Sequence, residues 1–138
     1  GKISLQVSHQ NGLDADLGYP TDIPNLKFPL VVNSSTGKYY SKNISIEKTY
    51  YLFKYLFLQK DIAVDRIFID QQIKSELCNY AKAQNEFSDK NKAAAQAMFE
   101  NLQHVRGHGD HFHVRIKCSK LDPACRGRIY RKMESCSI

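Results

Sequence analysis

The chain has 138 residues and a mass of 15.8 kDa, a size typical of one domain rather than two. Hydrophobic residues make up 42% and charged residues 25%, a globular composition that excludes a disordered tail. The formal net charge of +6 favours anionic partners, such as nucleic acid, anionic lipid or an acidic polymer, without choosing among them. No stretch reaches the roughly 18 uncharged apolar residues of a membrane span, because Lys54 interrupts residues 50–58.

The four cysteines allow three disulfide pairings, and no two of them form a CxxC motif. A zinc ribbon or a thioredoxin-like site is therefore not expected. An even number of cysteines without metal-type spacing favours oxidised bridges in an exported protein, the alternative being four buried free thiols in the cytosol. The chain opens at Gly1 with neither Met nor an apolar signal region, so we expect either a removed leader or a fragment.

Two short strands are predicted at the beginning of the chain. Apolar side chains alternate with polar ones along residues 2–7 and again along residues 13–17. In the second strand this alternation places the carboxylates of Asp14 and Asp16 on one face.

The middle of the chain is expected to pass from loop to helix. Residues 18–27 are rich in turn-forming residues, residues 28–32 are predicted as a short edge strand, and residues 33–43 as a surface loop. Ser45 is suited to cap a helix that runs to about Lys60, because apolar side chains recur there at helical spacing. This apolar stripe predicts a surface that faces the core.

The second half of the chain alternates strands and helices. Residues 65–69 are predicted as a strand, and Asp70 is suited to cap the helix that follows. An alanine-rich helix is predicted over residues 89–103 and a final strand over residues 111–117. Strands at both ends with helices between them predict a single α+β domain, in which a small antiparallel sheet packs with about three helices.

Histidines are concentrated near the final strand, and four of the five lie within residues 104–113. Strand alternation places His111, His113 and Arg115 on one face. Two imidazoles and a guanidinium would repel one another if all were charged, so a metal ion or an anionic ligand is expected beside them.

Zinc suits this group of residues. A catalytic zinc takes three protein ligands from histidine and carboxylate and leaves a fourth position for water. His9, Asp16 and one histidine of residues 111–117 would supply that set, and the other histidine would serve as general base. The rival pair, His104 and His108, has the spacing of helical zinc ligands but lacks the glutamate of HExxH, and the glycines beside His108 would disrupt a helix.

Two motifs resemble those of the penicillin-insensitive murein endopeptidases: SHQNGLDAD at residues 8–16 and GHGDHFHVRIKC at residues 107–118. These enzymes are zinc peptidases related to the D-Ala-D-Ala carboxypeptidases and to the hedgehog fold. The similarity continues through VDRIFIDQQIKSELC at residues 64–78 and CSKLDPAC at residues 118–125, so it covers most of the chain.

The resemblance implies a role for each matching residue. His9, Asp16 and His113 match the zinc ligands of the family, with one ion per chain. His111 matches the general base that activates the bound water. His108 matches a further active-site histidine, which would orient the base or stabilise the tetrahedral oxyanion.

The resemblance also implies two disulfides, Cys118 with Cys125 and Cys78 with Cys136. In one respect the chain departs from the family, whose members carry a longer segment before the first zinc motif. Here only eight residues precede His9, so part of one cleft wall would be absent or the domain, residues 1–138, would be trimmed at its N-terminus.

Side-chain chemistry predicts roles for two further charged residues near the matched site. Asp14 shares the face of Asp16 and is expected to orient a metal ligand rather than to be one. Arg115 is expected to hold a substrate carboxylate, since a guanidinium binds one with two parallel hydrogen bonds. The alternative for Arg115 is a salt bridge to Asp14 or Asp110.

The resemblance implies a zinc-dependent peptidoglycan endopeptidase that hydrolyses the D-alanyl–meso-diaminopimelyl cross-link, in the periplasm or secreted. Two alternatives keep the zinc: a D,D-carboxypeptidase acting on stem peptides, and a wall-binding module whose zinc is catalytically idle. Nucleic acid is not expected as a partner, because the basic residues lack interleaved aromatics on a strand face and no nucleic-acid-binding signature is present.

Overall fold

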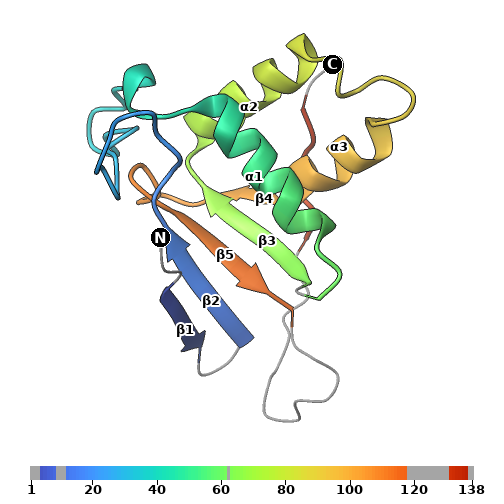
Figure 1. Ribbon diagram of the computed structural model, residues 1–138, viewed down its shortest axis with the longest axis horizontal. Coiled ribbons are helices and arrows are strands. Elements are labelled where there is room, and N and C mark those ends of the chain that lie inside the picture. Colours follow the sequence, from blue (N-terminus) through green and yellow to red (C-terminus); the bar gives the residue numbers. More distant parts are fainter. Residues whose placement is uncertain (1–3, 9–11, 62, 118–130, 137–138) are drawn as a thin grey trace.

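A computed structural model describes residues 4–8, 12–61, 63–117 and 131–136. These residues form three α-helices and a five-stranded sheet, which confirms the predicted α+β class (Figure 1). In chain order the elements are β1 (Ser4–Ser8), β2 (Gly12–Leu17), a 3-10 turn (Ser41–Asn43), α1 (Ile46–Leu58), β3 (Val64–Ile69), α2 (Gln71–Ala83), α3 (Lys92–Glu100), β4 (Leu102–His104) and β5 (Phe112–Ile116).

The strands lie side by side in the order β1-β2-β5-β3-β4. Neighbouring strands are antiparallel except for β3 and β4, which are parallel. The sheet is therefore mixed rather than purely antiparallel as predicted. The reason is the connection between these two strands: the chain crosses over through α2 and α3 and returns in its original direction, which only a parallel pair allows.

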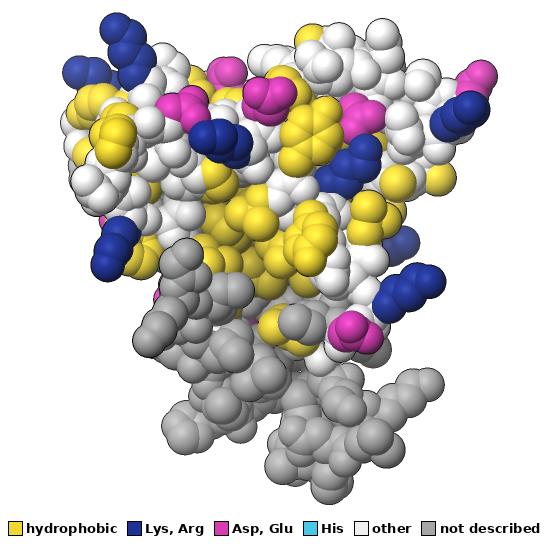
Figure 2. All heavy atoms as spheres, in the orientation of Figure 1, with side chains coloured by type: hydrophobic (Ala, Val, Ile, Leu, Met, Phe, Trp, Pro, Cys, Tyr) yellow, Lys and Arg dark blue, Asp and Glu magenta, His cyan; other side chains and the backbone are white. Residues whose placement is uncertain are grey.

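One face of the sheet is packed against the helices. Ile67 of β3 and Phe112 and Val114 of β5 are buried on this face, and the ring of Phe53 in α1 meets that of Phe112 edge-on at 4.9 Å between centroids. Figure 2 views the molecule from the side of α1, where hydrophobic side chains gather and no histidine is visible. Because side chains alternate along a strand, His113 must point to the opposite face.

The two predicted helix caps are present. The Ser45 side chain accepts a hydrogen bond from the backbone N–H of Lys48 at 3.2 Å and precedes α1. The Asp70 carboxylate accepts one from the N–H of Gln72 at 2.8 Å and precedes α2. Each cap satisfies a backbone donor that has no partner inside the helix. Within the described residues, none of the helices is both long enough and apolar enough to cross a membrane.

Two predicted elements are wrong in part. Residues 28–32 do not form an edge strand: only Val32 makes an isolated bridge, to Tyr39. Pro29 has no N–H to offer to a neighbouring strand. The helix predicted over residues 89–103 ends at Glu100, because Leu102 turns into β4 and is buried in the sheet.

A C-terminal strap, residues 131–136, is fastened to the domain by two buried cations. Arg66 donates from Nη2 to the carbonyl oxygen of Arg131 at 3.1 Å. Lys74 donates from Nζ to the carbonyl oxygen of Glu134 at 2.9 Å. Burial lowers the pKa of both side chains, so these carbonyl contacts compensate part of the cost of removing each charge from water.

The predicted disulfide between Cys78 and Cys136 is present and ties the strap to α2 across 58 residues of sequence. We expect the double variant Cys78→Ser/Cys136→Ser to lower the free energy of unfolding by about 2–4 kcal/mol, because the bridge restricts the unfolded chain. Urea unfolding of both proteins without reductant measures the difference. Equal unfolding midpoints would show that the contacts of Arg66 and Lys74 hold the strap without help.

Candidate active site

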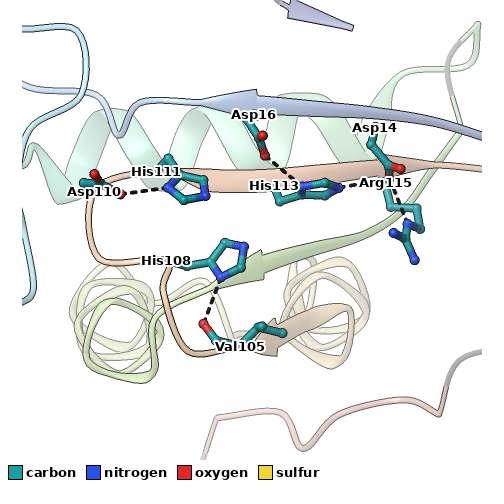
Figure 3. Close-up of polar contacts among 8 residues, drawn as sticks. All are labelled: Asp14, Asp16, Val105, His108, Asp110, His111, His113 and Arg115. Carbon is teal, nitrogen blue, oxygen red and sulfur yellow. Dashed lines mark hydrogen bonds and ion pairs between the residues drawn. The ribbon is translucent and has the colours of Figure 1, made fainter. Parts of the chain in front are cut away.

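Polar side chains gather on the face of the sheet that the helices leave open (Figure 3). The register of the two central strands places Asp16 of β2 opposite His113 of β5, and Asp14 opposite Arg115. His111 directly precedes β5. Strand alternation predicted the shared faces, and the pairing of β2 with β5 brings together two pairs of residues whose partners are about a hundred positions apart in the sequence.

His113 lies between two carboxylates. Its Nδ1 is hydrogen-bonded to Oδ1 of Asp16 at 2.7 Å, and its Nε2 lies 3.0 Å from Oδ1 of Asp14. The second contact is an ion-pair approach without hydrogen-bond geometry, so the buried Nε2 has no hydrogen-bond partner among the described residues. A neutral imidazole carries only one N–H and can donate to only one carboxylate. Two facing carboxylates therefore require either a doubly protonated ring or a cation bound between the ring and one of the carboxylates.

Asp14 is the most buried charge of this group, with 5% of its surface exposed. Besides its approach to His113, its Oδ1 accepts a hydrogen bond from Nε of Arg115 at 2.8 Å. A buried carboxylate is stable only when it is paired, and here Asp14 has a guanidinium partner in Arg115 and an imidazole beside it in His113. The salt bridge to Asp14 that was considered as the alternative for Arg115 is thus present.

Phe68 of β3 supplies the aromatic surface beside these charges. The register places it opposite His113, and the two ring centroids are 5.5 Å apart at 63°. The guanidinium carbon of Arg115 lies 5.2 Å from the same ring, within cation–π range. Phe68 was not among the predicted site residues, because in the sequence it is one apolar residue within a β-rich segment.

His111 is held by its neighbour Asp110, whose Oδ1 lies 2.7 Å from Nδ1 of the ring. Since a carboxylate only accepts, Nδ1 carries the proton and Nε2 of the neutral ring keeps its lone pair. A histidine prepared in this way can take a proton at Nε2. Asp110 was expected only as a possible partner of Arg115, although its position immediately before His111 indicates a carboxylate beside that ring.

His108 faces the same group from the loop between β4 and β5. Its Nδ1 lies 2.9 Å from the carbonyl oxygen of Val105 and therefore donates, and its ring centroid is 4.8 Å from that of His111. Burial lowers the pKa of His108, which favours the neutral ring. The rival helical pair with His104 is excluded, because His104 is an exposed residue of β4 and no helix spans the two positions.

The structure describes two of the three predicted zinc ligands. Asp16 and His113 lie side by side, whereas His9 lies outside the described residues, as do the cysteines of the predicted bridge at residues 118–125. In the described part of the chain no group of three His, Cys, Asp or Glu side chains is placed to hold a metal ion. The zinc site as a whole stays a prediction, and its two visible members are adjacent.

The loop that carries His108 and His111 is anchored by backbone hydrogen bonds. The carbonyl oxygen of Gly109 accepts from the N–H groups of both Val31 and Val32, at 2.8 and 3.0 Å. A Cβ atom at position 109 would overlap the carbonyl oxygen of Val32, so only glycine allows this approach.

We expect Gly109→Ala to lower the free energy of unfolding by about 3 kcal/mol or more, because backbone atoms must move to admit the methyl group. Gly37→Ala is the control: its Cβ meets open space, and its cost of about 1 kcal/mol comes from the positive φ alone. Chemical denaturation of both variants measures the difference. If Gly109→Ala were no more destabilising than the control, the close approach to Val32 would be wrong.

Comparison with known proteins agrees with the motif resemblance. The sequence model that describes the penicillin-insensitive murein endopeptidases matches residues 2–137, nearly the whole chain. No curated protein matches the chain significantly. The matched range contains every residue of the open sheet face described above. The chain therefore belongs to the penicillin-insensitive murein endopeptidase family, whose members hydrolyse the peptide part of peptidoglycan.

Proposed function

We propose that this protein is a zinc-dependent peptidoglycan endopeptidase that hydrolyses the D-alanyl–meso-diaminopimelyl cross-link. Family membership supports murein endopeptidase activity in general. The observation that carries the zinc mechanism is the placement of His113 against Asp16 and of His111 against Asp110 on the same open face. One pair is suited to bind a cation and the other to move a proton.

The donor set fits a single zinc ion. Asp16 and His113 would hold it together with His9, leaving one position of a tetrahedral site open. Asp14 lies 3.0 Å from Nε2 of His113, so Nδ1, the nitrogen beside Asp16, would be the one that binds the metal. When bound, zinc would polarise the scissile carbonyl and lower the pKa of a water molecule towards about 7.

His111 would act as the general base. Its Nδ1 is occupied by Asp110, so a proton can enter only at Nε2. The carboxylate of Asp110 keeps the ring oriented. His111 would then pass the proton to the leaving amine of the cross-link as the C–N bond breaks.

The geometry favours one of the two roles expected for His108. An oxyanion requires an N–H donor, but Nδ1–H of His108 is already directed at Val105 and the neutral ring has no second proton. With its ring 4.8 Å from His111, the role that remains is to orient the base.

Arg115 would bind a carboxylate of the stem peptide. Asp14 accepts from its Nε, and a guanidinium binds a carboxylate with two parallel hydrogen bonds. The same arginine therefore links substrate binding to the carboxylate that orients His113. A peptidoglycan substrate and the disulfide Cys78–Cys136 both support a periplasmic or secreted location.

The proposal is tested by incubating the protein with cross-linked muropeptide dimers, with and without a chelator, and analysing the products by mass spectrometry. We expect monomers that disappear with chelator and return when zinc is added. Loss of terminal D-Ala from intact dimers would identify a D,D-carboxypeptidase instead. One bound zinc without any cleavage would identify a wall-binding module.

Alanine variants of His113 and His111 should separate metal binding from proton transfer. We expect His113→Ala to lose both zinc and activity. His111→Ala should keep one zinc per chain and lower kcat by about 100- to 10 000-fold, the usual contribution of a general base. His104→Ala, an exposed histidine of β4, serves as the control and should keep both. Zinc content by mass spectrometry and dimer cleavage are the two readouts, and normal turnover by His111→Ala would exclude it as the base.

The orienting role of Asp14 predicts a change in zinc affinity. Asp14→Asn should weaken zinc binding about 10- to 100-fold, because the buried carboxylate that faces His113 loses its charge. The control is Asp22→Asn, which removes an exposed carboxylate paired with Lys48. Competition with a chromogenic chelator measures both dissociation constants. Equal zinc affinity in the two variants would show that Asp14 pairs with Arg115 but does not orient His113.

A further inference from the structure

We propose that the buried hydroxyl of Tyr19 is a positioning group for the catalytic histidines, holding the loop of residues 105–111 in its active geometry. This inference rests on the proposed function, in which His111 is the base and His108 orients it. Tyr19 itself contacts neither histidine ring, so it acts through the backbone of the loop.

The hydroxyl of Tyr19 connects three separate segments of the chain. It donates a hydrogen bond to the carbonyl oxygen of His108 at 2.7 Å and accepts one from the backbone N–H of Asp70 at 3.4 Å. The side chain is 1% exposed, and its ring packs against Phe112 at 5.5 Å between centroids. The hydroxyl is therefore held in place by the packing of its ring against the hydrophobic core.

Two consecutive carbonyl groups of the loop are held in this way. Tyr19 fixes that of His108, and the N–H groups of Val31 and Val32 fix that of Gly109. Because both carbonyl groups are held, the path of the backbone that leads to Asp110 and His111 is fixed. Both anchors come from the segment between β2 and α1, which passes beside the loop in Figure 1.

The anchors bear directly on the two histidine rings. The hydrogen bond from His108 to Val105 closes the start of the loop, and the His108 ring lies 4.8 Å from His111. Movement of the His108 carbonyl would shift both rings relative to His113 on β5. A displacement of about 1 Å in a catalytic group can lower the rate about 100-fold.

A phenylalanine would fill the same core position without the free-energy cost of burying a hydroxyl. Burying a hydroxyl is unfavourable unless it is hydrogen-bonded, and here it is bonded to the backbone of the His108 loop and to that of Asp70, the residue that caps α2. Burial also raises the pKa of Tyr19 well above its ordinary value, which favours the protonated hydroxyl that donates to His108.

The test compares Tyr19→Phe with Tyr50→Phe. Tyr50 is a matched control, because it is also 1% exposed and loses one buried hydrogen bond, to Glu86 at 3.1 Å, in the helical layer. We expect Tyr19→Phe to keep its zinc and lower kcat about 10- to 100-fold on muropeptide dimers, with KM changed less than about twofold. Tyr50→Phe should keep the kcat of the unmodified protein at a similar loss of thermal stability. Equal kcat in all three proteins, or an equal loss in both variants, would overturn the proposal.

A second measurement needs neither activity nor a variant that folds. In the unmodified protein, the amide protons of Val31 and Val32 should exchange with solvent as slowly as those of β5, because they are bonded to the loop that Tyr19 holds. Rapid exchange at both positions would overturn the inference even if the variant failed to fold. If the unmodified protein cleaved no murein, the proposed function would fail while slow exchange still supported the anchored loop.

Discussion

The register between β2 and β5 is the constraint on which the rest of the site depends. It places Asp16 opposite His113, and a slip of one residue would bring Ala15 there instead and turn the carboxylate towards the helices. The register is fixed from the other side of the sheet, where Phe112 packs against Phe53 of α1 and Val114 is buried. The hydrophobic face of β5 thus decides the geometry of its polar face, since one strand carries both.

Three buried charged side chains of the described residues, Asp14, Arg66 and Lys74, have compensating polar partners. Asp14 lies between His113 and Arg115, and the cations of Arg66 and Lys74 are met by backbone carbonyls of the strap. Because an unpaired charge in the interior is far more costly than a paired one, these contacts constrain where the surrounding segments can lie. The site and the C-terminal strap follow the same rule on opposite flanks of β3.

The loop before β5 carries catalytic side chains and is restrained by hydrogen bonds to its backbone. Catalytic groups are often carried on loops that a rigid scaffold positions. Here the scaffold reaches the loop through the carbonyls of His108 and Gly109, which are bonded to Tyr19 and to the segment at residues 31–32. His111 is consequently aligned by contacts made on its N-terminal side and by the strand on its C-terminal side.

The amino-acid sequence by itself determined the features that depend on neighbours along the chain. Strand alternation predicted that His113 and Arg115 share a face, and the caps at Ser45 and Asp70 followed from local hydrogen bonding. Tertiary structure alone decided that Leu102 leaves the helix to join β3, and that Arg115 pairs with Asp14 rather than Asp110. The physical reason is range: periodicity and capping act within a few residues, whereas parallel pairing, burial and ion-pair choice depend on segments that only the folded chain brings together.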